Sequence, residues 1–135
     1  MLTNAKAVYL DSSALVKLVV RERESEELIA FLTHHPIRIS CDLARVEVIR
    51  AVRIHGPRVV MRAREMLRAI QLVRLDRYLL DAAAETDPPL LRSLDAIHLA
   101  AAQALGETMT KFATYDVRLA RVALDVGFTV VSPGG

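Results

Sequence analysis

Short β-branched runs alternate with longer helical runs along the chain of 135 residues, and this alternation constrains the fold most strongly. Five runs are predicted to be strands: Ala7–Leu10, Ile37–Ser40, Gln71–Leu75, Met109–Thr114 and Phe128–Val131. Because helices separate these strands, the connections are crossovers, which join parallel strands. We therefore expect an α/β fold with a mainly parallel sheet flanked by helices, in one domain over residues 1–135.

Helices are predicted where apolar residues recur with helical spacing between capping residues and breakers. The expected spans are Ala14–Val20, Glu24 to Pro36, Asp42–His55, Arg58–Ile70, Asp76 to Pro88, Leu94–Leu105 and Val117–Val126. Ser12 and Ser13 are expected to cap the first of them, and Ser93 the Ala-rich one.

Several common catalytic motifs are absent, including a glycine-rich phosphate loop, G-x-S-x-G and H-E-x-x-H. The four histidines show no metal-site spacing, and each is expected at a helix end or on the surface. Cys41 is the only cysteine, so an intramolecular disulfide and a thiolate metal cage are excluded. Met1 to Lys6 carries no signal pattern, and the apolar stretches are shorter than a membrane span. We expect a cytoplasmic protein with no membrane association.

Acidic residues follow two of the predicted strands. Asp11 comes directly after the first strand and Asp116 soon after the fourth. Ligands of open α/β sheets bind outside the carboxyl ends of the strands, so both acids are expected at one edge. Either one could instead be a simple helix N-cap.

Two further acids occupy apolar helical stretches. Glu47 lies in the stripe Leu43, Glu47, Ala51 and Ile54, and Asp95 shares a face with Leu99 and Ala102. A buried, unpaired carboxylate is costly, so each needs a salt bridge or a cation. The internal alternative for these acids is a salt bridge with Arg92 or Lys17.

Four acids gathered at one site call for a compensating cation. Two carboxylates about 4 Å apart repel by roughly 4 kcal/mol at an effective dielectric constant of about 20. Oxygen ligands without His or Cys favour Mg²⁺ or Mn²⁺. The chemistry expected of such a site is metal-assisted hydrolysis of phosphodiesters.

Four segments around these acids resemble, in order, the motifs of PIN-domain ribonucleases of the VapC toxin type. They are Tyr9–Lys17, Leu43–Ala51, Leu94–Ala100 and Thr114–Leu119, the last followed by Gly127 and Val130–Val131. The resemblance covers nearly the whole chain, and it implies a five-stranded sheet in the order 3-2-1-4-5.

The resemblance also implies roles for individual residues. Asp11, Glu47, Asp95 and Asp116 would surround Mg²⁺ or Mn²⁺ as catalytic residues. Asp11 and Asp95 would be direct ligands, and the other two would act directly or through water. Thr114 and Ser13 would orient water or carboxylates. The implied partners are an RNA substrate, a second copy in a homodimer, and a VapB-type antitoxin that blocks the site.

Two other function classes stay open at this point. A non-catalytic PIN-like scaffold in RNA processing would keep the fold without a metal effect on melting. A phospho-acceptor signalling domain also gathers aspartates at strand ends, although it normally has an acidic pair where this chain has Asp11 followed by Ser12.

The formal charge of +2 conceals a strongly basic middle segment. Nine of the 15 arginines lie from Arg45 to Arg77, where only three acids occur, so this segment carries +6 and the remainder −4. Such asymmetry suggests a face for an anion. We predict that Arg58, Arg62 and Arg68 contact RNA or the antitoxin; ordinary solvated helix faces are the alternative.

Overall fold

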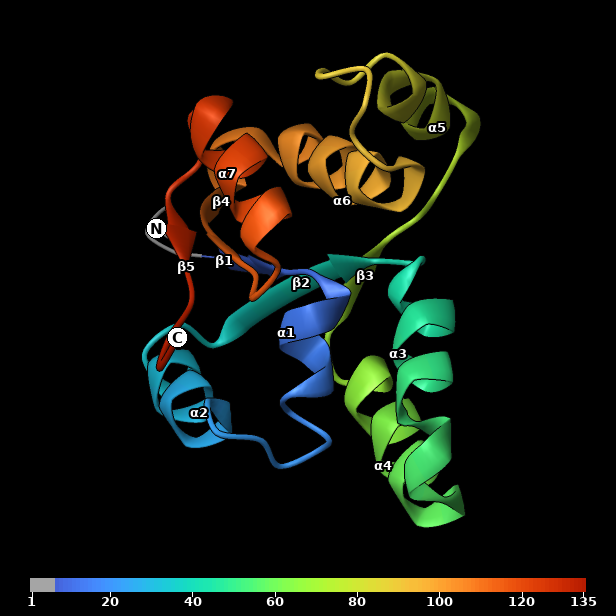
Figure 1. The fold of residues 1–135 in the computed structure, drawn as a ribbon, viewed down its shortest axis with the longest axis vertical. Coiled ribbons are helices and arrows are strands. Elements are labelled where there is room, and N and C mark those ends of the chain that lie inside the picture. Colours follow the sequence, from blue (N-terminus) through green and yellow to red (C-terminus); the bar gives the residue numbers. More distant parts are fainter. Residues whose placement is uncertain (1–6) are drawn as a thin grey trace.

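The computed structural model describes residues 7–135, which form a five-stranded parallel sheet with helices on both faces (Figure 1). The strands are β1 (Ala7–Leu10), β2 (Ile37–Cys41), β3 (Gln71–Val73), β4 (Met109–Ala113) and β5 (Val130–Val131). Their spatial order is β3-β2-β1-β4-β5, and every neighbouring pair is parallel. The predicted α/β class and strand order are therefore confirmed. Residues 1–6, in which no signal pattern is expected, lie outside the described residues.

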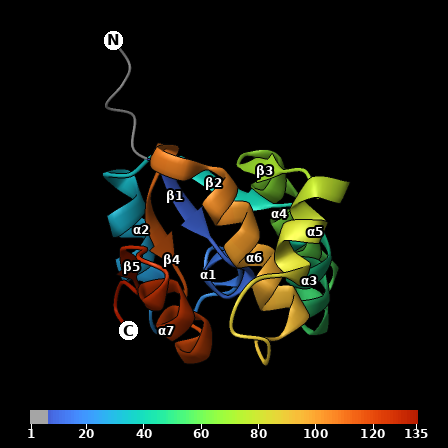
Figure 2. The same cartoon turned by 90° about the horizontal axis from the view of Figure 1, so that it is seen from above.

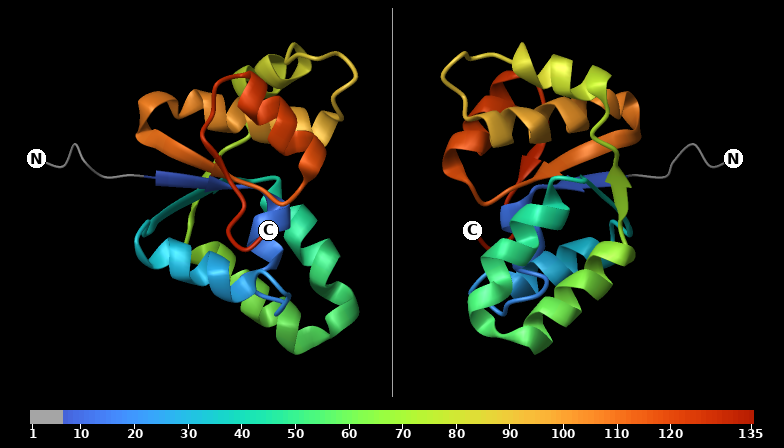
Figure 3. Two further views of the ribbon diagram at one scale, coloured as in Figure 1. Left: turned by 60° about the vertical axis from the view of Figure 1, so that its left-hand side comes forward. Right: turned by 90° about the vertical axis from the view of Figure 1, so that its right-hand side faces the viewer.

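The helices form one layer on each face of the sheet (Figure 3). One layer contains α1 (Ser12–Val16), α2 (Ser25–Thr33), α3 (Ala44–Val52) and α4 (Pro57–Arg68). The other contains α5 (Arg77–Ala84), α6 (Ser93–Ala104) and α7 (Val117–Asp125), with α5 beside α6 (Figure 2). Two short 3₁₀ turns, η2 (Arg53–His55) and η3 (Gly106–Thr108), join neighbouring elements. Among the described residues, no helix has the length and apolarity needed to cross a membrane.

The central strand β1 is buried on both faces. Ala7 and Tyr9 face the layer of α5, α6 and α7, whereas Val8 and Leu10 face the layer of α1 to α4. All four side chains are at most 1% exposed. This double burial explains why the strand is a continuous apolar run rather than an alternating one.

Several predicted helix boundaries differ from the structure. Asp11, rather than Ser12 or Ser13, caps α1: its backbone is extended and its Oδ1 accepts the N–H of Ala14 at 3.0 Å. Helix α6 begins at Ser93 with Arg92 at the N-cap and no side-chain cap. The span predicted from Asp42 to His55 divides into α3 and η2. Asp76, where a helix was predicted to begin, is the N-cap of α5 and accepts the N–H of Leu79 at 2.9 Å.

Backbone pairing continues past the ends of the central strands and fixes the sheet edge where the acids lie. The N–H of Asp11 donates to the carbonyl of Ala113 at 3.2 Å, and the N–H of Thr114 donates to that of Val131 at 3.2 Å. The residues that lead into α1 and α7 are thus held by the sheet itself.

Candidate active site

All four acids predicted from the sequence line one pocket at this sheet edge. The cavity has a volume of about 270 Å³. Its lining consists of Asp11, Ser12, Ser13, Glu47, Arg92, Ser93, Leu94, Asp95, His98 and Asp116. The acids come from the end of β1, from α3, from the first turn of α6 and from the cap of α7, so only the tertiary fold brings them together.

Asp11 is the most deeply buried of the four acids, at 3% exposure. Its Oδ1 accepts the hydroxyl of Ser13 at 2.6 Å, and its Oδ2 accepts the hydroxyl of Thr114 at 2.5 Å. Burial nevertheless raises the pKa of Asp11, because these hydrogen bonds only partly offset the loss of water. Within residues 7–135 no cationic side chain pairs with it.

Ser13 and Thr114 connect Asp11 to the segment that follows β4. The Thr114 hydroxyl also accepts the N–H of Asp116 at 3.0 Å, and the Ser13 hydroxyl accepts the N–H of Tyr115 at 3.0 Å. Thr114 itself is fully buried. Each hydroxyl therefore orients a carboxylate and a backbone amide at the same time.

Glu47 is half-buried and is held by two partners. Its Oε1 accepts the hydroxyl of Ser12 at 2.6 Å and lies 2.9 Å from Nε2 of His98. Burial acts to raise the pKa of Glu47, but the hydrogen bonds of His98 and Ser12 outweigh it and lower the pKa. Glu47 is consequently ionised at neutral pH.

The reason given in the sequence analysis for the burial of Glu47 is wrong. The buried face of α3 consists of Ala44, Val48, Ile49 and Val52. In the predicted stripe, Ala51 is exposed and Ile54 is 87% exposed. Glu47 lies at the border of the buried face and points into the pocket because the start of α3 sits at the sheet edge.

His98 and Ser12 are site residues that the sequence analysis missed. The expectation that His98 lies at a helix end or on the surface is wrong: it sits inside α6 at 2% exposure. The available signal was its position three residues after Asp95, which places both on one side of the helix. Ser12, expected as a cap, donates to Glu47 instead.

Arg92 bridges the remaining two acids. Its Nη2 lies 3.1 Å from Oδ2 of Asp95 and 3.0 Å from Oδ2 of Asp116. The internal salt bridge considered for Asp95 is thus present with Arg92, whereas Lys17 pairs with Glu22 and Glu24.

Asp116 is both a helix cap and a pocket residue. Its Oδ1 accepts the N–H groups of Arg118 and Leu119, at 2.9 and 3.1 Å. Its Oδ2 is the atom that pairs with Arg92. The two interpretations of this residue are compatible because each uses a different oxygen.

The carboxylate oxygens of the pocket are suitable ligands for a hard divalent cation, provided that two of the acids release Arg92. Four carboxylates share the cavity, and the buried charge of Asp11 has no cationic partner in the described part of the chain. In residues 7–135, however, no three acidic, His or Cys side chains already converge closely enough to hold a metal ion. Asp95 and Asp116 would have to exchange Arg92 for the cation.

The predicted arginine contacts lie on α4, away from the pocket. Arg58 and Arg68 are exposed. Arg62 is exposed too, but its Nη2 donates to the carbonyl of Val19 at 3.1 Å, so it also ties α4 to the end of the α1 region.

Comparisons with known proteins agree with this fold. The family model described as PIN domain matches residues 8–124. Ribonuclease VapC46 of Mycobacterium tuberculosis (strain ATCC 25618 / H37Rv) is 47% identical over 128 residues, which cover 94% of this chain and 98% of that protein. Ribonuclease VapC47 of M. tuberculosis (strain CDC 1551 / Oshkosh) is 40% identical over 132 residues, which cover 94% and 97%.

A solved structure supports the fold independently. The crystal structure of M. tuberculosis VapC20, a Sarcin-Ricin loop cleaving toxin, matches with a TM-score of 0.75 at 16% identity. The match covers 93% of this chain and 99% of VapC20. The chain therefore belongs to the PIN-domain family, and its relatives at 40–47% identity are VapC ribonucleases.

Proposed function

We propose that this protein is a Mg²⁺- or Mn²⁺-dependent endoribonuclease toxin of the VapC type, which hydrolyses RNA phosphodiester bonds and is neutralised by a VapB-type antitoxin. The observation that carries the proposal is the convergence of four acids from four elements on one pocket. Relatives that are VapC ribonucleases, matched over nearly their whole length, support the same activity.

Each acid receives a role under this proposal. Asp11 and Asp95 would hold the cation directly, and Glu47 and Asp116 would do so directly or through water. A bound divalent ion would activate water and stabilise the departing oxygen. The ionised Glu47 can accept a hydrogen bond from the attacking water, and the hydroxyls of Ser13 and Thr114 keep the Asp11 carboxylate in one orientation.

The basic helix pair α3–α4 is proposed to contact RNA or the antitoxin. Arg58, Arg62 and Arg68 are the residues predicted from the sequence. The structure adds a groove of about 330 Å³ between the two helices, lined by Arg45, Val46, Arg64, Leu67 and Arg68. Within the described residues, the three arginines of this groove form no ion pair, so an anion would meet unpaired guanidinium groups.

The proposed function also includes an oligomeric state and a cellular location. We place one PIN-like nuclease domain over residues 1–135, acting as a cytoplasmic homodimer whose complex with the antitoxin is a hetero-oligomer. Large exposed apolar side chains on α3, α4 and α5, among them Val46, Met61 and Tyr78, support contacts with protein partners.

The activity is tested with purified protein and RNA. We expect cleavage in Mn²⁺ or Mg²⁺ and none in EDTA. Asp11→Asn and Asp95→Asn should abolish cleavage while circular dichroism shows an unchanged fold, and Asp81→Asn, at an exposed position on α5, should cleave like wild type. A wild-type protein that cuts no RNA in Mn²⁺ would contradict the proposal.

One observation favours the alternative of a non-catalytic scaffold: Arg92 already neutralises part of the acidic pocket. A melting temperature that does not respond to divalent ions would support that alternative. The flavodoxin-like fold, which phospho-acceptor domains can adopt, has the strand order 2-1-3-4-5, which differs from the order found here.

A further inference from the structure

A path of buried side chains leads from the centre of the sheet to Glu47. Oη of Tyr9, on β1, lies 2.7 Å from Nδ1 of His98, on α6. Nε2 of the same imidazole lies 2.9 Å from Oε1 of Glu47, on α3. Tyr9 is 0% and His98 2% exposed, so water does not compete for either bond.

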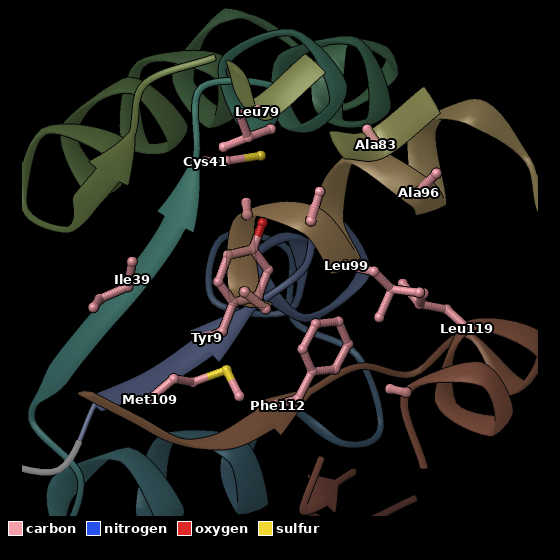
Figure 4. Close-up of a cluster of buried hydrophobic side chains, with 14 of the residues drawn as sticks. Tyr9, Ile39, Cys41, Leu79, Ala83, Ala96, Leu99, Met109, Phe112 and Leu119 are labelled. Atoms are coloured by element: carbon pink, nitrogen blue, oxygen red, sulfur yellow. The ribbon is translucent and has the colours of Figure 1, made fainter. Parts of the chain in front are cut away.

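The aromatic core fixes the position of Tyr9. Its ring stacks on Phe112 with centroids 5.3 Å apart, and Phe112 stacks in turn on Phe128 at 5.5 Å. Figure 4 shows the Tyr9 and Phe112 rings side by side, with the Tyr9 hydroxyl directed toward the end of the cluster where Cys41 lies. The packing of β1 against β4 therefore determines where this hydroxyl meets α6.

His98 in turn has only one orientation that satisfies its surroundings. Its ring meets the Tyr9 ring edge-on at 75°, and Sγ of Cys41 lies 3.8 Å from Nδ1. Rotation of the ring would break the bonds to Tyr9 and Glu47, which is costly for groups that are buried.

We propose that His98, held by Tyr9, is a positioning residue that fixes the carboxylate of Glu47 for its work in the pocket. Both His98 and Ser12 bond to Oε1. In the described structure Oε2 has no hydrogen-bond partner, so it is the oxygen left for a cation or a water. The role of Glu47 in catalysis rests on the proposed function, whereas its fixed orientation does not.

A purely structural role for His98 explains less. A leucine at this position would fill the same apolar layer without burying two polar nitrogens. Ser12 alone would already give Oε1 a hydrogen-bond donor. His98 is the second donor, and its bond to the buried Tyr9 holds it in place. It therefore restrains Glu47, whose side chain is still 24% exposed.

The test compares variants that remove one bond at a time. Tyr9→Phe removes the hydroxyl and keeps the ring stack, His98→Leu removes both nitrogens, and His98→Gln keeps an N–H donor that can reach Glu47. Leu32→Ala is the control, because Leu32 is a fully buried residue in the layer on the opposite face of the sheet.

The readouts are Mn²⁺ affinity by calorimetry and the single-turnover rate of RNA cleavage at saturating Mn²⁺. We expect His98→Leu to weaken Mn²⁺ binding by about 10- to 100-fold, Tyr9→Phe to weaken it less, and His98→Gln to recover most of the loss. Leu32→Ala should lower the melting temperature and leave Mn²⁺ affinity unchanged. Wild-type affinity and rate in both Tyr9→Phe and His98→Leu would overturn the proposal.

Metal-free crystal structures separate this proposal from the proposed function. If the wild type binds no Mn²⁺ and cuts no RNA, the nuclease assignment fails. The positioning role is then decided by the Glu47 side chain, which should occupy one conformer in the wild type and several in His98→Leu. A single unchanged conformer in His98→Leu would overturn it. If His98→Leu does not fold, Tyr9→Phe and His98→Gln carry the same comparison.

Discussion

At the scale of single residues, Asp11 places a cost on the stability of the fold. Burial raises its pKa, which means that the folded state disfavours the charged carboxylate relative to the unfolded state. Asp11→Asn removes that charge at neutral pH. We therefore expect the metal-free variant to have a higher melting temperature than wild type, because the buried charge is gone.

The stability gained by Asp11→Asn should depend on pH in one direction: it should be largest at neutral pH and disappear in acid. Below the ordinary pKa of 3.8 the carboxyl is protonated in both states, so the penalty is absent; it grows as the pH rises from 3.8 to the folded-state pKa and is constant above that value. Thermal melts from pH 3.5 to 7 should show the gain of Asp11→Asn shrinking toward acid. Asp81→Asn removes an exposed charge and should change the melting temperature little. A difference in melting temperature between Asp11→Asn and wild type that stays the same from pH 3.5 to 7 would contradict the argument.

At the scale of elements, Arg92 connects the start of α6 to the cap of α7. Its guanidinium pairs with Asp95 and Asp116, two of the acids proposed to hold the cation. These charges in turn raise the pKa of Arg92, with Asp95 the main cause. Because the arginine and a divalent ion compete for the same oxygens, Arg92→Gln should bind Mn²⁺ severalfold more tightly in calorimetric titrations.

Arg118→Gln is the matched control for this competition. Arg118 is exposed on α7 two residues after Asp116, and its side chain forms no ion pair in the part of the chain that the structure describes. Arg118→Gln changes the net charge by the same amount as Arg92→Gln, and it should change the Mn²⁺ affinity less. Equal effects of the two variants would show that net charge alone acts, and weaker binding by Arg92→Gln would show that Arg92 organises the acids.

At the scale of the whole molecule, the helix pair α3–α4 projects from the sheet (Figure 1), and six arginines of the basic middle segment lie on these two helices. RNA binding driven by phosphate contacts weakens with salt, and each contact contributes about 0.7 to the logarithmic slope for a single strand. Neutralising Arg45, Arg64 and Arg68 together should lower the slope by about 2. The set predicted from the sequence, Arg58, Arg62 and Arg68, should also lower it. Binding is measured in an Asp95→Asn background, in which RNA stays intact.

Arg21 and Arg23 supply the comparison for these arginines. Both are exposed, but they pair with Glu26 and Glu24, so their neutralisation should leave the slope unchanged. A slope that is the same for the groove variants and for this pair would move the RNA contact to another surface.

The architecture followed from the alternation of strand and helix patterns, because crossover connections between buried strands permit few topologies. The strand order came from the resemblance of four motifs, and the structure agrees with it. Helix ends were less predictable. Ser93 is a residue type typical of helix caps, yet Arg92 occupies that position, with an extended backbone and no side-chain cap.

The fold class and the choice of the four acids were predictable from the order of residues along the chain, although the apolar stripe predicted for Glu47 is not the buried face of α3. The partners of these acids depend on the tertiary fold. His98 meets Tyr9 across 89 residues of chain and Glu47 across 51, and Arg92 meets Asp116 across 24. Local patterns describe the face of one element, whereas such contacts depend on how faces of different elements meet. That is why an expected surface histidine became the buried support of a pocket carboxylate.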